Sequence, residues 1–357
     1  MKKIFFISAI AAVMFGLTSC DDKDEPSQNP DNPTHSTGAY FLCQGQAYNH
    51  VPGGLFALDY TTGKWSDNAF QTANGISLGD TPQWGICYGS KLYLGIFDSN
   101  VIHIVDKYTF KNFKTISLKD SKNGQKPRSL VAKDGKVYIA MYDGYVARLD
   151  TLSMDIEASV KVGPNPEVIG IYKDELYVPN SNGEDYPNYG TTASVVNLKD
   201  FSVTQTIDVP MNPYMFRATD QGLFLLCKGN YEDIASQVYK MNGDKWDAVA
   251  NATIMAADKD KLYLVDDPFY GSVPAEYRIY DCVTNKVVDW NIEKVIYPNN
   301  IAVDRIGGRI FISSYYMDGK YPSFKAPGYV SVYGLDNSFI SKHDIGAGAP
   351  CIFFDHE

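Results

Sequence analysis

The sequence predicts an all-β fold, a seven-bladed β-propeller with four-stranded blades. Three observations lead to this prediction. The composition favours short strands and turns over helices, because the 357 residues include 29 Gly, 18 Pro and 26 Tyr. A short aromatic strand recurs about every 45 residues, which is the length of one propeller blade. The last residues of the chain supply the strand that the first repeat lacks.

The first 19 residues have the features of a signal peptide. Lys2 and Lys3 precede an apolar run over residues 4–17, which at about 14 residues is too short to span a membrane as a helix. The run ends in LTSC, which resembles the lipobox of bacterial lipoproteins, where the cysteine is acylated and becomes the mature N-terminus. We therefore predict a lipoprotein signal peptide over residues 1–19 and lipidation of Cys20. The alternative is an ordinary signal peptide followed by a cysteine without this role.

Residues 20–37 comprise the acylated cysteine and a segment rich in Pro, Asn, Asp and Ser, without apolar periodicity. This composition predicts a flexible acidic tether, so the propeller spans residues 38–357. The acidic run at residues 21–25 resembles the surface-export signal of Bacteroidota lipoproteins, and an ordinary solvated tether is the alternative. The expected location is the outer membrane, with the lipid-anchored propeller exposed at the cell surface.

The repeated strand centres on an aromatic residue among apolar and β-branched neighbours. Seven such anchors occur: Tyr40, Tyr93, Tyr138, Tyr177, Phe224, Tyr263 and Phe311. A proline stands 11 residues before four of them, and these prolines are Pro82, Pro127, Pro166 and Pro213. The interval has room for one strand and a two-residue turn, such as Asp134-Gly135, which suits a type I′ hairpin. The spacing therefore predicts the first two strands of each blade.

Two further strands complete each predicted blade. A third strand follows the anchor strand and usually ends in Asp or Asn, as in residues 101–106, because such a side chain can start a turn. A fourth strand precedes the next repeat. The first anchor lacks a preceding strand, and residues 350–354 supply it from the other end of the chain. The C-terminus thus closes the ring and removes open sheet edges, with a six- or eight-bladed ring as the alternative.

The closing strand leads to a prediction for two cysteines. In the second to sixth repeats the two-residue turn fixes which residues face each other across the first two strands. The same register in the first repeat, counted from Pro350 and Tyr40, places Cys43 opposite Cys351. Export to an oxidising compartment permits a disulfide between Cys43 and Cys351. The alternative is that both cysteines are buried and reduced.

Charge and motif content exclude several classes of function. The formal net charge is −10, and about −12 once Lys2 and Lys3 are removed with the signal peptide, which argues against nucleic acid or anionic lipid as a partner. We therefore expect membrane contact only through the lipid anchor. The five histidines show no zinc-binding spacing, and the sequence has no nucleophile elbow, P-loop or dinucleotide fingerprint. No catalytic residue, metal or cofactor is predicted.

The most distinctive residues lie in segments that a propeller brings to one face. The connections between second and third strands open on the same side of the ring as those that enter each first strand. Most of the former are long and rich in Tyr and Asn, which supply rigid contact area and directional hydrogen bonds. The predicted ligand-binding residues are Trp84, Arg128, Tyr186, Tyr189, Tyr214, Tyr231, Tyr270, Asn300, Tyr316 and Tyr321. The alternative is that they are ordinary surface and seam-filling residues.

Several of these patterns resemble a known family. The proline-to-anchor spacing and the Val-x-x-x-Val-Asp strand at residues 101–106 resemble YncE-like seven-bladed propellers. The lipobox, the segment ANGISLGD at residues 73–80 and the ending at residues 346–354 resemble, more narrowly, the Bacteroidota surface-layer propeller lipoproteins. That group includes a vitamin B12-capturing surface lipoprotein. The resemblance covers nearly the whole mature chain, and its motifs specify the scaffold better than the ligand.

The resemblance implies a protein that is not an enzyme. Such a protein would bind an extracellular ligand, with cobalamin (vitamin B12) or a similar large small molecule favoured, and pass it to a TonB-dependent outer-membrane transporter. A corrin ring suits the predicted face because it presents a wide apolar surface bordered by amides. Two alternatives stay open: a surface module that binds a protein or glycan, and a lactonase-like propeller enzyme whose site is assembled from distant loops.

Overall fold

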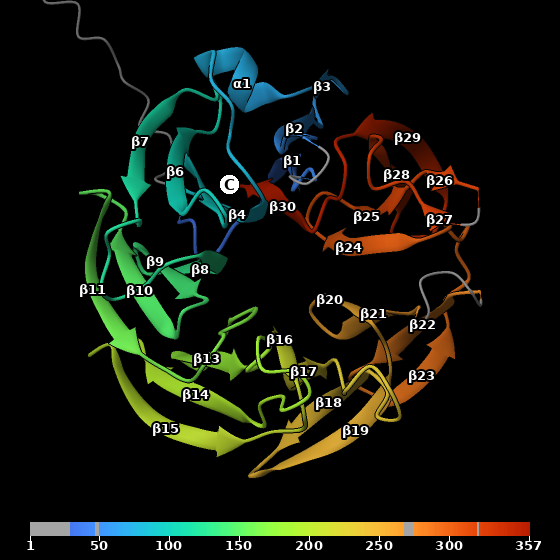
Figure 1. Ribbon diagram of the computed structural model, residues 1–357. Helices are drawn as coiled ribbons and strands as arrows, with labels where there is room; N and C mark the ends of the chain where they lie inside the picture. Colours follow the sequence, from blue (N-terminus) through green and yellow to red (C-terminus); the bar gives the residue numbers. More distant parts are fainter. Residues whose placement is uncertain (1–28, 47–49, 268–273, 320) are drawn as a thin grey trace, which may run out of the picture.

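The computed structural model describes residues 29–46, 50–267, 274–319 and 321–357, and it confirms the predicted fold class. Seven four-stranded antiparallel sheets stand around a central axis as the blades of a propeller (Figure 1). Within the described residues no helix is long and apolar enough to cross a membrane. The predicted signal peptide and Cys20 lie outside the described residues.

The strands of each blade follow one another outward from the axis. The inner strands are β30 (Cys351–His356), β4 (Pro82–Tyr88), β8 (Pro127–Lys133), β12 (Gly170–Tyr172), β16 (Pro213–Thr219), β20 (Ile254–Ala257) and β24 (Pro298–Asp304). The second strands are β1 (Ser36–Cys43), β5 (Lys91–Ile96), β9 (Lys136–Met141), β13 (Glu175–Asn180), β17 (Gly222–Cys227), β21 (Lys261–Asp266) and β25 (Arg309–Tyr315). The third strands are β2 (Gly54–Asp59), β6 (Val101–Asp106), β10 (Tyr145–Asp150), β14 (Thr192–Asn197), β18 (Gln237–Asn242), β22 (Glu276–Asp281) and β28 (Gly328–Gly334). The outer strands are β3 (Trp65–Ser66), β7 (Asn112–Ser117), β11 (Asp155–Lys161), β15 (Ser202–Asp208), β19 (Lys245–Asn251), β23 (Lys286–Asp289) and β29 (Phe339–Ile345).

Two short elements lie outside the blades. Helix α1 (Ala69–Asn74) follows β3, and a small hairpin of β26 (Met317–Asp318) and β27 (Tyr321–Pro322) stands at the rim of blade seven (Figure 1). The hairpin between β8 and β9 has the predicted type of turn. Asp134 and Gly135, between β8 and β9, have φ angles of 51° and 72°, the pair of positive values that a type I′ turn requires.

The aromatic anchors fill the seams between blades. Tyr93 of blade two is fully buried in a cluster with Leu130 and Ile139 of blade three. Phe311 of blade seven is fully buried against Phe41 of blade one. The recurrent aromatic residue is therefore a structural requirement of the ring, because each blade uses it to bury its face against the next blade.

The ring closes as predicted, but the predicted register at the joint is wrong by one residue. Strand β30 pairs with β1 and completes blade one, and Cys351 faces Leu42 rather than Cys43. In blade two the register shifts between Pro82 and Trp84 and leaves one residue unpaired as a β-bulge. Blade one has no such bulge at this point of β30, so its register differs from the rule that blades two to six suggested.

The shift by one residue places the side chains of Cys43 and Cys351 on opposite faces of the sheet of blade one. Cys351 packs with Leu42 at the seam with blade two, whereas Cys43 packs with Phe311 at the seam with blade seven. Successive side chains of a strand point to opposite faces, so a disulfide cannot join these sulfurs. Cys43 and Cys351 are both free and buried, and burial raises the pKa of the Cys351 thiol to about 12.

Candidate functional site

A polar ring surrounds the mouth of the central channel, on the face where the inner strands begin. In six blades the residue that follows the repeat's proline, or the alanine in its place, is polar: Gln83, Arg128, Glu167, Tyr214, Thr253 and Asn299. In β4, β8, β16 and β24 the register shift marks this residue as a β-bulge. A bulge frees a side chain from the alternation of the strand, and the fold uses it to direct polar groups toward the axis.

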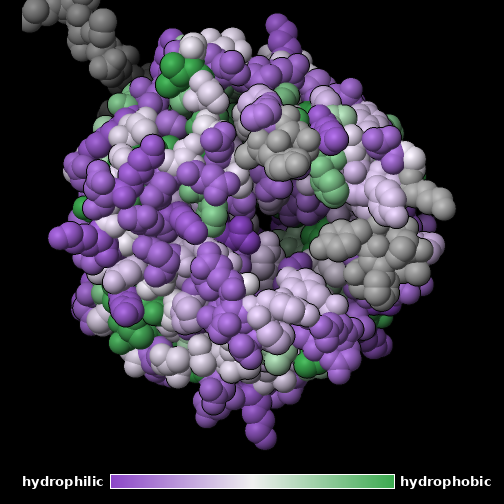
Figure 2. Space-filling view, viewed as in Figure 1, coloured by the Kyte–Doolittle hydropathy of each residue, from purple (hydrophilic) through white to green (hydrophobic). Residues whose placement is uncertain are grey.

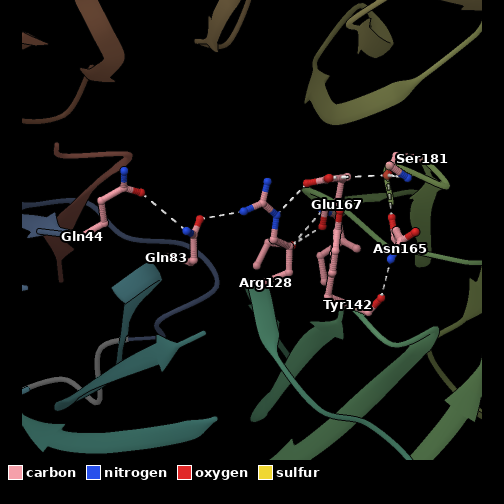
Figure 3. Close-up of polar contacts among 10 residues, drawn as sticks. Gln44, Gln83, Arg128, Tyr142, Asn165, Glu167 and Ser181 are labelled. Carbon is pink, nitrogen blue, oxygen red and sulfur yellow. Dashed lines mark hydrogen bonds and ion pairs between the residues drawn. The ribbon is translucent and has the colours of Figure 1, made fainter. Parts of the chain in front are cut away.

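Hydrogen bonds connect this ring across four blades (Figure 3). Arg128 is the centre: its Nε donates to Glu167 Oε2 at 2.6 Å, and its Nη1 donates to Gln83 Oε1 at 2.7 Å. Gln83 Nε2 in turn donates to Gln44 Oε1 at 3.5 Å, and Ser181 Oγ donates to Glu167 Oε1 at 3.4 Å. Glu167 is only 6% exposed, so its ion pair with Arg128 is shielded from water and held in one geometry.

A second cation stands beside this ion pair. Lys228, directly after β17, donates from Nζ to the Thr253 carbonyl at 2.6 Å and lies 4.6 Å from the centre of the Tyr214 ring. Burial lowers the pKa of Lys228 to about 8, against the opposing effect of Glu167. Burial also raises the pKa of Glu167, while the carboxylate of Glu167 holds the pKa of Arg128 above its ordinary value.

A third cation, Arg217 of β16, lies deeper in the channel. Its guanidinium is 5.6 Å from the centre of the Trp84 ring, and its Nη1 donates to the Phe216 carbonyl at 3.0 Å. Among the residues that the structure describes, no carboxylate forms an ion pair with Arg217, and burial lowers the pKa of its side chain. Arg217 and Trp84 line a cavity of about 150 Å³, together with Asn300 and Cys351.

Three tyrosines form a cluster on the loops of blades four and five. Tyr189 makes edge contacts with Tyr186 at 6.0 Å and with Tyr231 at 5.8 Å between ring centres. Tyr186 and Tyr231 are 62% and 65% exposed, and the Tyr186 hydroxyl donates to Glu232 at 2.6 Å. The loop that carries Tyr186 and Tyr189 also supplies Ser181 to the polar ring, so the cluster adjoins the channel mouth.

The structure divides the other predicted binding residues into two groups. Trp84, Arg128, Tyr214 and Asn300 lie on the inner strands around the channel. Tyr316 and Tyr321 instead belong to the hairpin region at the rim of blade seven, where Tyr316 donates to Asp344 of the outer strand (Figure 1). Tyr270 lies outside the described residues.

The predicted binding residues did not include several members of the site, among them Gln83, Glu167, Arg217 and Lys228. Gln83 and Glu167 could have been predicted from the sequence. Both directly follow the repeat's proline, and every blade from two to seven has a polar residue at this position. Arg217 also differs from the residues at the same position when the internal repeats of the chain are aligned with one another. The corresponding residue is apolar or glycine in the other internal repeats: Ile86, Val131, Gly170, Ala256 and Ala302.

The chemical character of the channel is that of a binding site rich in donors. In the described ranges no group of three His, Cys, Asp or Glu side chains is placed to hold a metal ion. Arg128, Arg217 and Lys228 provide three cationic groups, and the carboxylates near them are those of Glu167 and of Asp267, whose backbone N–H donates to Thr253 Oγ1. Figure 2 shows the same face of the molecule, which is hollowed at the centre of the ring.

Comparisons with known proteins place the chain among β-propellers. No protein-family model matches it, and no curated protein is significantly similar in sequence. A putative 6-phosphogluconolactonase from Bacteroides uniformis is similar in structure, with a TM-score of 0.61 and 11% identity, over 89% of this chain and 100% of that one. A chain of Kuenenia stuttgartiensis hydrazine synthase has a TM-score of 0.59 and 13% identity, over 92% and 100% of the two chains.

A functionally unknown protein from Desulfotomaculum acetoxidans is also similar, with a TM-score of 0.61 and 10% identity, over 90% of this chain and 99% of that one. Because all three structures are far below 25% identical, the similarity shows the fold alone. The fold and its neighbours define this chain as a seven-bladed β-propeller, and function must be argued from its own site.

Proposed function

We propose that this chain is a non-enzymatic surface lipoprotein that binds cobalamin, or a similarly large and flat ligand, and passes it to a TonB-dependent transporter. The observation that carries the proposal is the exposed cluster of Tyr186, Tyr189 and Tyr231 next to the channel mouth. The polar ring beside it offers hydrogen-bond donors and acceptors for the periphery of such a ligand.

The cluster has the physical properties of a pre-organised contact surface. Edge contacts fix the three rings relative to one another, so little side-chain entropy is lost when a ligand covers them. Each ring offers an apolar face with a hydroxyl at its tip, which suits a ligand with a broad apolar face and polar substituents. The corrin ring of cobalamin, bordered by amides, has this character.

The proposed lipid anchor and surface display are argued from the sequence of the N-terminal segment. The LTSC motif at residues 17–20 and the acidic run at residues 21–25 support a lipid anchor on Cys20 and display at the cell surface. Replacing Cys20 with Ser removes the thioether site, so the variant should leave the detergent phase in which the wild-type protein partitions. A Cys20→Ser protein that still partitions into detergent would show that the lipoprotein assignment is wrong.

The ligand is tested by titrating the mature protein with cyanocobalamin and measuring bound cobalamin by absorbance after dialysis. We expect the wild type to bind cyanocobalamin. The double variant Tyr186→Ala/Tyr189→Ala should lose at least thirtyfold in affinity, because aromatic residues that a ligand buries commonly contribute about 2 kcal/mol or more, and 2 kcal/mol corresponds to about thirtyfold. Tyr321→Ala is the matched control, since Tyr321 is 74% exposed but lies at the rim of blade seven. Its affinity should stay within about twofold.

Three outcomes overturn parts of the proposal. A wild-type protein that retains no cobalamin removes cobalamin as the ligand, and binding to a protein or glycan then becomes the leading function. Equal loss of thermal stability and of affinity in the double variant would assign the tyrosines to packing. Hydrolysis of a sugar lactone by the purified protein would refute the non-enzymatic assignment, which is supported by the engagement of Glu167 with Arg128 and Ser181.

A further inference from the structure

Arg217 is an unusual residue for the inside of a propeller. It occupies an inner-strand position that is apolar or glycine in the other internal repeats, and its guanidinium lies over the Trp84 ring. A guanidinium has five N–H donors, and the described contacts of Arg217 use one of them, on the Phe216 carbonyl. Charges that are largely withdrawn from water are normally paired, and among the described residues no carboxylate forms an ion pair with the half-buried Arg217.

The surroundings of Arg217 are suited to a negative charge. The adjoining cavity of about 150 Å³ has room for several heavy atoms, because a water molecule in the liquid takes about 30 Å³. Tyr214 of the polar ring lies within electrostatic range of Arg217 as well as of Arg128 and Glu167. The channel thus gathers three cationic side chains, Arg128, Arg217 and Lys228, inside a protein whose net charge is −10.

A second, independent observation is an unused donor at the mouth. The Nδ2 of Asn299, the bulge residue of β24, is buried and has no hydrogen-bond partner among the described residues. An unpaired buried N–H is costly, so this amide is a second donor on the inner strands that lacks a partner. The unused groups at Asn299 and Arg217 are therefore both donors, which is the complement of an anionic acceptor.

We propose that the central channel is a binding site for one small oxyanionic group, a carboxylate or a phosphate, held by the Arg217 guanidinium. The group enters from the loop face, where Arg128 and Lys228 add positive potential, and it occupies the cavity lined by Trp84 and Asn300. The site differs from the tyrosine cluster, so it does not depend on cobalamin as the ligand. The anion is either free in solution or part of a larger molecule that docks on the face.

The test compares wild type with Arg217→Met, which keeps an unbranched apolar side chain and removes the charged guanidinium. Melting temperatures are measured with inorganic phosphate, acetate or glycerol 3-phosphate against chloride at equal ionic strength, and affinities by titration calorimetry. We expect a melting temperature that rises with the anion in the wild type and at least a tenfold weaker affinity in Arg217→Met. We also expect Arg217→Met without anion to melt no lower than the wild type, because the unpaired charge is gone.

Further variants and probes decide the remaining cases. Arg305→Met is the matched control, because Arg305 is a half-exposed arginine that pairs with Asp258, and its anion response should equal that of the wild type. If Arg217→Met fails to fold, Arg217→Lys keeps the charge and should retain binding with reduced affinity. Binding of phosphate and acetate assigns a free small anion, whereas binding of glycerol 3-phosphate alone assigns a group carried by a larger molecule. An equal response of wild type and Arg217→Met to all three anions overturns the proposal.

Discussion

The joint between β30 and blade two allows a quantitative test of how the ring is held closed. A Cβ added at Gly85 of β4 would stand 2.6 Å from Cε1 of Phe353 and 3.0 Å from Cδ2 of Leu94. Carbon atoms pack best at about 3.5–4.0 Å, so Gly85→Ala must displace the Phe353 ring, which stacks on Tyr40 at 5.1 Å. We expect the substitution to lower the free energy of unfolding by about 1–3 kcal/mol.

A second substitution identifies the cause of this loss. Phe353→Leu shortens the side chain and removes the two ring atoms nearest the new methyl group, at a cost of its own of about 1 kcal/mol. The double variant should therefore lose less than the sum of the single losses, by about 1 kcal/mol or more. For a folded part of about 320 residues, 1 kcal/mol corresponds to about 1.5 °C in Tm, which differential scanning calorimetry resolves.

Gly170→Ala is the matched control for this cycle. A Cβ added at Gly170 would lie 2.9 Å from the Cβ of Phe216 and 3.0 Å from the Phe216 carbonyl oxygen. This seam is not one that Phe353 contacts. Gly170→Ala and Phe353→Leu should therefore be additive, because independent sites usually are. If Gly85→Ala and Phe353→Leu are also additive, the clash at the joint is not the source of the destabilisation and the reasoning is refuted.

Two further predictions concern the channel lysine and the cysteines at the joint. Burial lowers the pKa of Lys228 to about 8, and a bound anion favours its charged form. The affinity for acetate, whose carboxylate stays ionised throughout this range, should therefore be constant below that pH and fall above it, and Lys228→Met should remove the fall. Calorimetric titrations of both proteins would contradict the assignment if the two profiles match. Alkylation of the denatured, unreduced protein should modify both Cys43 and Cys351, and a disulfide-linked peptide containing both would disprove the observed register.

The sequence was a good guide to the fold wherever neighbouring strands are joined by a short turn. The two-residue turn at Gly89 and Ser90 sets Tyr88 opposite Lys91, and the same local rule recurs around the ring. No turn joins β30 to β1, whose residues are some 300 positions apart in the chain. There the register depends on which side chains fill the two seams, and counting from a proline cannot determine it.

The candidate site was partly predictable for a related reason. Trp84, Arg128, Tyr214 and Asn300 lie on inner strands, whose place around the axis follows from the repeat. The loop tyrosines could be assigned to a face but not to positions on it, because long loops follow no repeated geometry. Tyr186, Tyr189 and Tyr231 meet, while Tyr316 turns outward to Asp344.

The absence of a bulge at the beginning of β30 also affects the site. Blade one has no polar bulge residue to contribute, so another residue must fill its place in the polar ring. Gln44, the residue after β1, takes this place: its amide accepts a hydrogen bond from Gln83, and its backbone N–H donates to the Gly348 carbonyl at 2.7 Å. One member of the ring thus comes from the N-terminal strand and is held by the segment that leads into the C-terminal strand. The Gln44 end of the Gln44–Gln83–Arg128 chain is thus positioned by a backbone contact at the place where the two ends of the chain meet, which links closure of the ring to the geometry of the channel mouth.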